Sequence, residues 1–270
     1  MREKVNKITA VIRKQVHASP LTGIVLGTGL GELVNEIRQP TELLYKELEG
    51  FPLTTVEGHK GRMIFGKLGN KDVMVMQGRV HFYEGVTMQD IALPVCVMKQ
   101  LGVHLLILSN ASGGLNPSFQ IGDLMLVTDQ INLMNAAPRI DPNEAVAVRQ
   151  HTDMSQVYDG KLIALAKHVA KKHTIPLQSG VLAAVTGPVF ETKAEYAYIR
   201  YLGADAVGMS IIPEAIAAHQ LGISCFAMTV ISDLGMPGKV IRVSHEEVQQ
   251  AASKTEPRMT LLITKLLEAM

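Results

Sequence analysis

Cysteine is scarce in this sequence, and its scarcity excludes several kinds of site. Only Cys96 and Cys225 occur among 270 residues, both in apolar surroundings and at no metal-binding or redox spacing. We therefore expect two buried free thiols, which suit a reducing cytosol, and no disulfide framework.

Charge of one sign and long apolar runs are also lacking. The net charge is +1 and the isoelectric point is near 7.8, so there is no general basic field for nucleic acid, and any anion is bound locally. The first residues, MREKVNKITAVIRKQ, are neither a signal peptide nor a membrane span. Their spacing predicts an amphipathic helix that turns Val5, Ile8, Ile12 and Val16 inward. We expect a cytoplasmic protein with no membrane partner.

What is present is ample material for a core. Hydrophobic residues make up 47% of the chain and charged residues 19%, so disorder is excluded. Apolar runs alternate with helical patterns, and no repeat, low-complexity tract or linker interrupts them. We predict one α/β domain over residues 1–270.

The central element of this domain is the stretch from Leu105 to Pro117, LLILSNASGGLNP. Leu105 to Leu108 fit a strand that is buried on both faces. The small residues from Ser109 to Gly114 predict a loop at the carboxyl end of that strand, where open α/β sheets bind ligands. Backbone N–H groups in such a turn favour an anion, although an ordinary strand-to-loop junction fits the same letters.

A second glycine turn follows the predicted strand Ile24 to Leu26. Gly27-Thr28-Gly29-Leu30-Gly31-Glu32 lacks the final glycine of a dinucleotide fingerprint and the Gly-Lys-Ser/Thr of a Walker loop. The Thr28 hydroxyl and several N–H groups remain suited to an anion, or the loop is shaped by packing alone.

The stretch from Gln77 to Gly85 carries three functional side chains at spacing two. In extended backbone, Arg79, His81 and Tyr83 share one face and offer a guanidinium fork, an imidazole and a phenol. This pattern favours an oxyanion beside a sugar, against the alternative of a solvated edge strand. Before it, Gly58 to Gly78 predicts two strands joined at Gly69-Asn70. His59 fits either a ligand contact or a loop histidine that is solvated or structurally bonded.

Three capping boxes mark helix starts, at Thr87 with Asp90, Thr192 with Glu195, and Ser244 with Glu247. Further helices are predicted over Gly160 to His173 and from Pro213. Strands are predicted over Asp123–Thr128, Val181–Val185, Ala206–Ser210 and Ser224–Ile231. Gln130 to Asp153 has no clear periodicity, which is typical of a lid, a functional loop or a subunit contact.

Polar residues follow the later strands. Glu191 sits beside Phe190 where a strand turns into a helix, a pairing that suits a flat heterocycle with N–H donors or simply a surface acid favoured by the helix dipole. Ser232-Asp233 follows the last strand, and His245 lies in the first turn of the C-terminal helix.

Taken in order, these motifs resemble those of the trimeric purine nucleoside phosphorylases. The matching segments are residues 27–31, 58–62, 78–85, 110–117, 187–195, 207–214 and 245–248, so the resemblance covers the chain from about Ile24 to the C-terminal helix. The family implies a single α/β domain with a mixed, partly barrel-like sheet flanked by helices. It also implies a homotrimer, no metal, no cofactor and inorganic phosphate as co-substrate.

The resemblance also implies roles for individual residues. Phosphate is expected at Thr28, His59, Arg79, His81, Ala111 and Ser210; the nucleoside at Tyr83, Phe190, Glu191, Met209, Asp233 and His245. Among these, His81, Glu191, Asp233 and His245 are the expected catalytic residues. Phosphate would attack the anomeric carbon through an oxocarbenium-like state, helped mainly by positioning and electrostatics.

The chain departs from the family at two points. Asp233 stands where members acting on 6-oxopurines usually carry asparagine, which leaves the choice between 6-oxo and 6-amino purines open. No phenylalanine lies between Phe119 and Phe190 to complete a neighbouring subunit's sugar site, and His151 is a candidate replacement.

Three other functions fit parts of the sequence. Asp233 suits a methylthioadenosine phosphorylase or an adenosine-accepting phosphorylase of the same fold, although His245 is placed for a polar 5'-hydroxyl. A nicotinamide-dependent oxidoreductase depends only on the incomplete fingerprint at Gly27, and absence of cofactor binding would exclude it. A non-catalytic nucleoside-binding module would bind without releasing base when phosphate is added.

Overall fold

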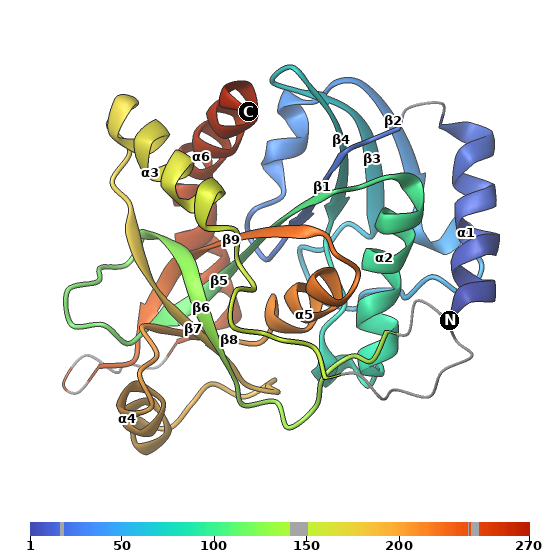
Figure 1. Ribbon diagram of the computed structural model, residues 1–270. Coiled ribbons are helices and arrows are strands. Elements are labelled where there is room, and N and C mark those ends of the chain that lie inside the picture. The colour runs from blue at the N-terminus through green and yellow to red at the C-terminus, as the bar shows by residue number, and fades with distance from the viewer. Residues whose placement is uncertain (17–18, 141–150, 237, 239–242) are drawn as a thin grey trace.

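A nine-stranded mixed sheet forms the centre of the molecule, and one part of it closes on itself (Figure 1). The computed structural model describes residues 1–16, 19–140, 151–236, 238 and 243–270. The strand order is β2-β3-β4-β1-β5-β8-β7-β6-β9, and β9 also pairs with β5. The strands β5 to β9 therefore make a closed barrel, and β1 to β4 extend from it as an open arm. This confirms the predicted mixed, partly barrel-like sheet.

The open arm consists of β1 (Thr22–Leu26), β2 (Arg38–Leu44), β3 (Arg62–Leu68) and β4 (Lys71–Gln77). β3 and β4 form the predicted antiparallel hairpin, and β1 runs parallel to both β4 and β5. β2 was not predicted, because five of its seven residues are exposed and show no apolar alternation.

The barrel consists of β5 (Leu105–Gly114), β6 (Leu124–Asn132), β7 (Gln178–Ala184), β8 (Ala206–Gly208) and β9 (Ser224–Leu234). β5 runs parallel to β9 and antiparallel to β8, while β6 runs antiparallel to β9. Alternate side chains of β5 face two separate cores: Leu106 and Leu108 join one cluster, and Leu105 and Ile107 join the other.

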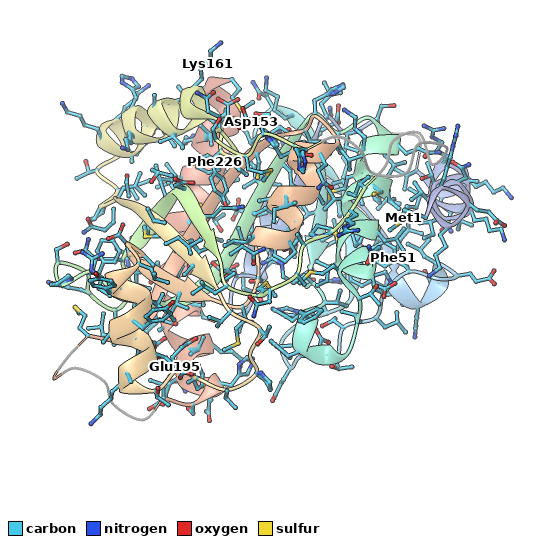
Figure 2. All side chains as sticks on the ribbon, turned by 60° about the horizontal axis from the view of Figure 1, so that its bottom comes forward. Met1, Phe51, Asp153, Lys161, Glu195 and Phe226 are labelled. Carbon is cyan, nitrogen blue, oxygen red and sulfur yellow. The ribbon has the colours of Figure 1, made fainter. Side chains whose placement is uncertain are left out.

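Helices cover both faces of the sheet. α1 (Arg2–Gln15) packs on α2 (Met88–Leu101), and α2 packs on α5 (Ile212–Gln220), while α3 (Gly160–Lys172) packs on α6 (His245–Ala269) on the other face. α4 (Lys193–Tyr201) lies at the barrel end, and short 3-10 turns η1 (Glu32–Glu36), η2 (Tyr45–Glu47) and η3 (Phe82–Glu84) join elements. In Figure 2, Phe226 lies inside the molecule, whereas Lys161 projects away from it at α3.

Several local predictions are confirmed. All three capping boxes form, with side-chain acceptors at Thr87, Thr192 and Ser244. The N-terminal helix buries Val5, Ile8 and Ile12, and Val16 is buried just beyond its end. Both cysteines are buried free thiols.

The predicted ends of the two central strands are wrong. β5 does not stop at Leu108, because residues 109–114 continue to pair with β9, and β9 continues to Leu234 rather than ending at Ile231. The small polar side chains are accommodated by hydrogen bonds with one another and with backbone carbonyls. The hydroxyls of Ser112 and Thr229 lie 2.7 Å apart, and Ser109 donates to the carbonyl of Val25. The small and polar residues 109–114 therefore form part of the barrel wall and not a loop.

The predicted extended face at Arg79, His81 and Tyr83 is also wrong. Residues 82–84 form η3, which ends at Gly85 in the left-handed region. The turn closes because the N–H of His81 donates to Glu84 Oε1 at 2.6 Å. Of the irregular stretch from Gln130 to Asp153, β6 takes the first residues, and 141–150 lie outside the described residues. Its role as a lid or subunit contact stays a prediction.

A buried carboxyl on α6 gives the fold a pH dependence. Glu256 is 3% exposed, and its Oε1 accepts from the N–H groups of Glu32 and Leu33 at 2.6 and 3.1 Å. Burial raises the pKa of Glu256 from 4.5 to about 7 despite these bonds. The folded state thus holds this proton more tightly than the unfolded state. The protonated Glu256 carboxyl therefore adds to the free energy of unfolding in full below pH 4.5, and this contribution is lost as the pH rises through about 7.

We expect Glu256→Gln to remove this dependence. Between pH 4.5 and 8 the free energy of unfolding of the wild type should fall by about 2 kcal/mol relative to the variant, allowing for partial hydration of the carboxyl. Urea unfolding across this range measures the difference. Glu268→Gln, at a half-exposed position on the same helix, is the matched control. Parallel curves for the wild type and Glu256→Gln would contradict the prediction.

Candidate active site

One cavity of about 440 Å³ lies where the barrel meets the open arm, a volume ordinary for a small-molecule site. Every residue expected to contact a ligand lines it except His59 and Arg79. The lining residues come from the ends of β1, β5, β8 and β9, from η3, from the segment before α4 and from the start of α6. Segments far apart in the sequence therefore meet here, as the ordered motifs indicated.

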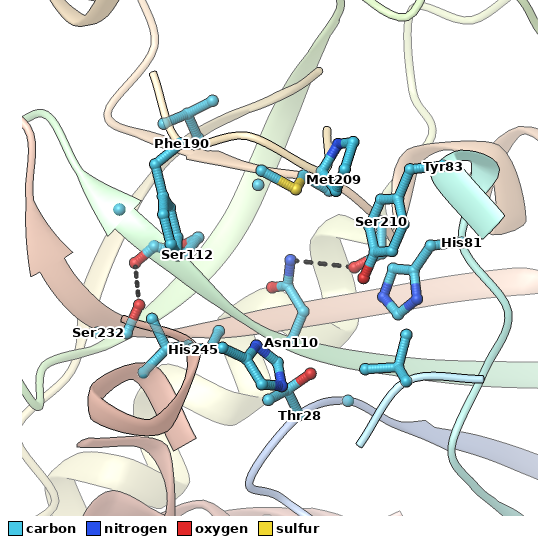
Figure 3. A pocket seen from close by; sticks show the side chains of 18 of the residues that line it. Thr28, His81, Tyr83, Asn110, Ser112, Phe190, Met209, Ser210, Ser232 and His245 are labelled. Atoms are coloured by element: carbon cyan, nitrogen blue, oxygen red, sulfur yellow. Dashed lines mark hydrogen bonds between the residues drawn. The ribbon is translucent and has the colours of Figure 1, made fainter. Parts of the chain in front are cut away.

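The cavity has two chemically different ends (Figure 3). His81, Tyr83 and Ser210 lie toward one end, and Phe190, Ser112 and Ser232 toward the other, with Asn110 between them and Thr28 and His245 alongside. Hydroxyls and imidazole dominate the first end. An aromatic ring and the carboxyls of Glu191 and Asp233 dominate the second.

At the hydroxyl end, Glu84 orients His81. The carboxylate of Glu84 accepts from the N–H and hydroxyl of Thr55 and from the N–H of His81, and lies 3.2 Å from His81 Nδ1. Burial opposes its charge, but these hydrogen bonds prevail and lower the pKa of Glu84 to about 2. With Nδ1 donating to Glu84, Nε2 of His81 is left for a ligand. The ring stacks on Tyr83 at 4.9 Å between centroids, so its orientation is fixed.

Ser210 is held at the same end by a strained turn. Ile211, which follows it, has φ 72° and ψ −57°, and the N–H of Ile212 donates to the Ser210 carbonyl at 2.9 Å. This is a γ-turn that a β-branched residue adopts only at a cost of about 1–3 kcal/mol. Asn110 Nδ2 donates to Ser210 Oγ at 3.3 Å, as the dashed line in Figure 3 shows.

Asn110 lines the cavity and was not among the site residues predicted from the sequence. Its Oδ1 is buried and has no hydrogen-bond partner within the described part of the chain. A side chain at Gly208 would place Cβ 2.9 Å from Asn110 Nδ2, so glycine permits this close approach. The sequence signal is the asparagine just beyond the apolar run Leu105 to Leu108. The loop-like composition of residues 109–114 hides it.

Arg79 and His59 lie behind the cavity wall. Arg79 is 2% exposed, its Nε donates to Glu214 Oε1 at 2.6 Å, and Nη1 donates to the Ser109 carbonyl. Its Nη2 is buried and lacks an acceptor in the described structure, which leaves that nitrogen as the atom able to reach an anion. His59 Nε2 lies 3.4 Å from Thr28 Oγ1. Burial and the nearby His81 lower the pKa of His59 to about 4. It is therefore neutral at pH 7 and supports Thr28.

At the carboxyl end, burial raises the pKa of both Glu191 and Asp233. Asp233 is 5% exposed, its Oδ1 lies 2.8 Å from Ser232 Oγ, and its Oδ2 lies 3.5 Å from the hydroxyl of Tyr196. Tyr196 also lines the cavity and was not identified from the sequence, because it falls inside a helix where an aromatic residue normally indicates packing. This end can donate and accept hydrogen bonds along the edge of a flat heterocycle.

His245 and Met209 line the middle of the cavity. His245 begins α6 and is exposed. Its Nε2 lies 3.1 Å from Gln249 Nε2, which also donates to the Glu57 carbonyl. Met209 follows β8. His151, the candidate for a shared sugar wall, lies outside this cavity and lines a separate hollow with Gln130 and Arg139.

Residues 1–16, 19–140, 151–236, 238 and 243–270 bring together no group of three or more histidine, cysteine or acidic side chains that could hold a metal ion. Among the helices described, none combines the length and the apolar character needed to cross a bilayer.

Comparisons with known proteins agree with this architecture. The model of the phosphorylase superfamily matches residues 22–268. Purine nucleoside phosphorylase 1 of Bacillus subtilis is 43% identical over 99% of this chain and 98% of its own, and the Rattus norvegicus purine nucleoside phosphorylase is 36% identical over 96% and 92%.

Solved structures give the same result. The Schistosoma mansoni purine nucleoside phosphorylase in complex with adenosine superimposes with a TM-score of 0.92 at 35% identity, covering 99% of this chain and 97% of that one. The same enzyme with inosine gives a TM-score of 0.91 at 34% identity, covering 99% and 96%. With the matched model, the relatives and the cavity in agreement, the chain belongs to the purine nucleoside phosphorylases of the phosphorylase superfamily.

Proposed function

We propose that this phosphorylase cleaves purine ribonucleosides and deoxyribonucleosides with inorganic phosphate, and that inosine and guanosine are its better substrates. The observation that carries the proposal is the division of the cavity. Hydroxyls and an oriented imidazole at one end suit phosphate, and the half-buried Glu191 and the buried Asp233 at the other suit a purine edge.

Each end has a separate part in the reaction. Thr28, Ser210 and His81, with Arg79 and His59 behind them, would hold phosphate against the anomeric carbon. Tyr83, Met209 and His245 would bind the sugar between. As the glycosidic bond breaks, the purine leaves with negative charge, and donors at its edge stabilise that charge. No covalent intermediate, metal or cofactor is required.

Glu191 favours 6-oxopurines in this scheme. An ionised Glu191 accepts the N1–H of hypoxanthine or guanine, whereas adenine presents a lone pair there. A protonated Asp233 donates to N7, and its burial supports that state. An ionised Asp233 would instead accept from a 6-amino group, so we expect adenosine to be turned over measurably. The solved complexes of the Schistosoma enzyme with adenosine, inosine and guanosine show that relatives bind both classes.

Phosphate dependence tests the proposal directly. Release of base from inosine should vanish in phosphate-free buffer and return when phosphate is added, because phosphate is the attacking group. Coupled detection of hypoxanthine measures the rate, and pentose 1-phosphate should form in equal amount. Equal rates with and without phosphate would indicate a hydrolase.

Methylthioadenosine phosphorolysis is the second candidate function, favoured by Asp233. His245, beside the sugar region of the cavity, favours a polar 5'-hydroxyl over a thioether. Assaying inosine beside methylthioadenosine distinguishes the two.

We also propose a cytoplasmic homotrimer. The buried thiols suit the location, and the stretch 130–153, whose sequence has no clear periodicity, suits a subunit contact. Light scattering at working concentration should give three times the chain mass of 29.3 kDa. A monomer that keeps full activity at nanomolar concentration would contradict the assembly.

A further inference from the structure

Tyr196 lies between the two carboxyls at the base end of the cavity. It belongs to α4, is 4% exposed, and packs in a cluster with Leu115, Ile199 and Val207. A Cβ at position 235 would lie 2.4 Å from the Tyr196 ring, so only glycine leaves room for the ring there. The ring is therefore held between Gly235 and the apolar cluster. This packing fixes where its hydroxyl points.

The hydroxyl faces both acids. It lies 3.5 Å from Asp233 Oδ2, and a hydrogen bond between Tyr196 and Glu191 lowers the pKa of Glu191 against the larger effect of burial. A phenol can donate one hydrogen bond and accept another at the same time. It therefore fits one carboxylate and one carboxylic acid better than two carboxylates or two acids.

The remaining surroundings also oppose two charges at this end. Glu195, on α4 beside Tyr196, adds a further negative charge near Glu191, and Asp233 itself repels Glu191. On β9, Ser232 Oγ donates to Asp233 Oδ1 at 2.8 Å, so a proton on Asp233 is carried by Oδ2, the oxygen that faces Tyr196. His245 on α6 and His81 before η3 are the imidazoles that line the same cavity.

We infer that Tyr196 is a positioning residue that keeps one proton shared between Glu191 and Asp233 and lets it move from one to the other, so that one site binds both 6-oxo and 6-amino purines. The inference rests on the proposed phosphorolysis. For a 6-oxopurine, Glu191 is the carboxylate and accepts from N1–H, and Asp233 carries the proton. For a 6-aminopurine, Asp233 is the carboxylate and accepts from the amino group, and Glu191 carries the proton and donates to N1.

The transfer balances without any added reagent. The transfer takes place before the nucleoside binds: Asp233 gives its proton to the Tyr196 oxygen while the Tyr196 hydroxyl gives its own to Glu191, and the reverse step restores the first state. In the complex, the protonated acid donates to the purine and the Tyr196 hydroxyl donates to the carboxylate. The total is one proton in both states. Inosine and adenosine therefore need the same protonation of the enzyme.

The wild type provides the first test. Across the pH plateau of kcat/KM, the ratio of inosine to adenosine should stay constant, because the paired carboxyls hold one proton for either nucleoside. A ratio that changes tenfold or more across the plateau would overturn the inference, since the two nucleosides would then need different numbers of protons.

Tyr196→Phe provides the second test. The ring is kept, but the bridge that favours the singly protonated pair is lost, so the plateau should narrow for both nucleosides, with the acid limb moving up by about one pH unit. Tyr198→Phe, on the exposed side of the same helix, should leave both limbs in place. A purely structural defect would lower the plateau without moving its limbs.

The outcomes separate this inference from the proposed function. Suppose that base release depends on phosphate but the pH profiles of kcat/KM have the same limbs in Tyr196→Phe and Tyr198→Phe. This result would overturn the shared proton and leave the proposed function in place. No release from either nucleoside by the wild type would overturn both.

Discussion

Replacing Arg79 by methionine is expected to lower the free energy of unfolding by about 3–5 kcal/mol, the largest loss of stability among the changes considered. Arg79 and Glu214 form an ion pair of 2.6 Å whose side chains are 3% and 5% exposed. Removing the cation leaves a buried carboxylate with no compensating charge. Glu214 Oε2 already lacks a partner in the described structure, so nothing else there takes over.

A double variant distinguishes the pair from its separate charges. In Arg79→Met with Glu214→Leu, both charges are absent, and stability should recover a large part of what either single variant loses. Urea unfolding of all four proteins completes the cycle. Lys67→Met breaks an ion pair of 2.8 Å whose side chains are about half exposed, and should cost less than about 1 kcal/mol. If Arg79→Met behaves like this control, the ion pair does not stabilise the fold.

The same variant examines the expected phosphate contact of Arg79. Since Nη2 lacks an acceptor among the described residues, a phosphate contact through it should make KM for phosphate rise far more than KM for inosine in Arg79→Met. Measurements belong at a temperature where the variant is still folded. Equal effects on both values would show that Arg79 acts only through the fold.

Replacing Asp233 by asparagine is expected to reduce kcat/KM for adenosine about ten- to a hundredfold while inosine changes much less. An amide donates to N7 at every pH, as the protonated acid does, but it cannot form the charged acceptor that suits a 6-amino group. Loss of a hydrogen bond to a charged group costs about 1.5–3 kcal/mol, which corresponds to this range.

Comparison with Glu191→Gln sharpens the result. Glutamine at that position can donate to the N1 lone pair of adenine, so adenosine should lose less than inosine, which is the opposite order. If adenosine is the preferred substrate of the wild type, the proposed ranking is wrong. An inosine-to-adenosine ratio untouched by Asp233→Asn would show that this carboxyl does not contact the base.

The sequence predicted most elements because their signals are local. Capping boxes at Thr87, Thr192 and Ser244 depend on residues three apart, and the N-terminal helix depends on a periodicity contained within one segment. The hairpin of β3 and β4 is local in the same sense. The barrel-like sheet and the cavity residues were predicted from the resemblance of the ordered motifs to the family, because no local pattern in the sequence indicates them.

The misses have a common physical cause. Residues 109–114 and 232–234 have loop-like composition, yet they pair across the barrel, and only tertiary contacts such as that of Ser112 with Thr229 make them strands. Tyr196 was missed for a related reason. Whether an aromatic residue on a helix packs or also aims a hydroxyl into a cavity depends on its neighbours in space, here Asp233 and Gly235.

Closure of the barrel by β5 and β9 also determines when the site can form during synthesis. Ser112 and Thr229, which meet across this seam, are 117 residues apart in the chain. A ribosome must therefore release nearly the whole polypeptide before β5 finds its partner, and contacts of such long range slow folding. Until then the small polar residues of β5 present an unpaired strand edge, which is prone to association with other chains. We expect nascent chains that end before β9 to need protection by chaperones, and to have no ligand site.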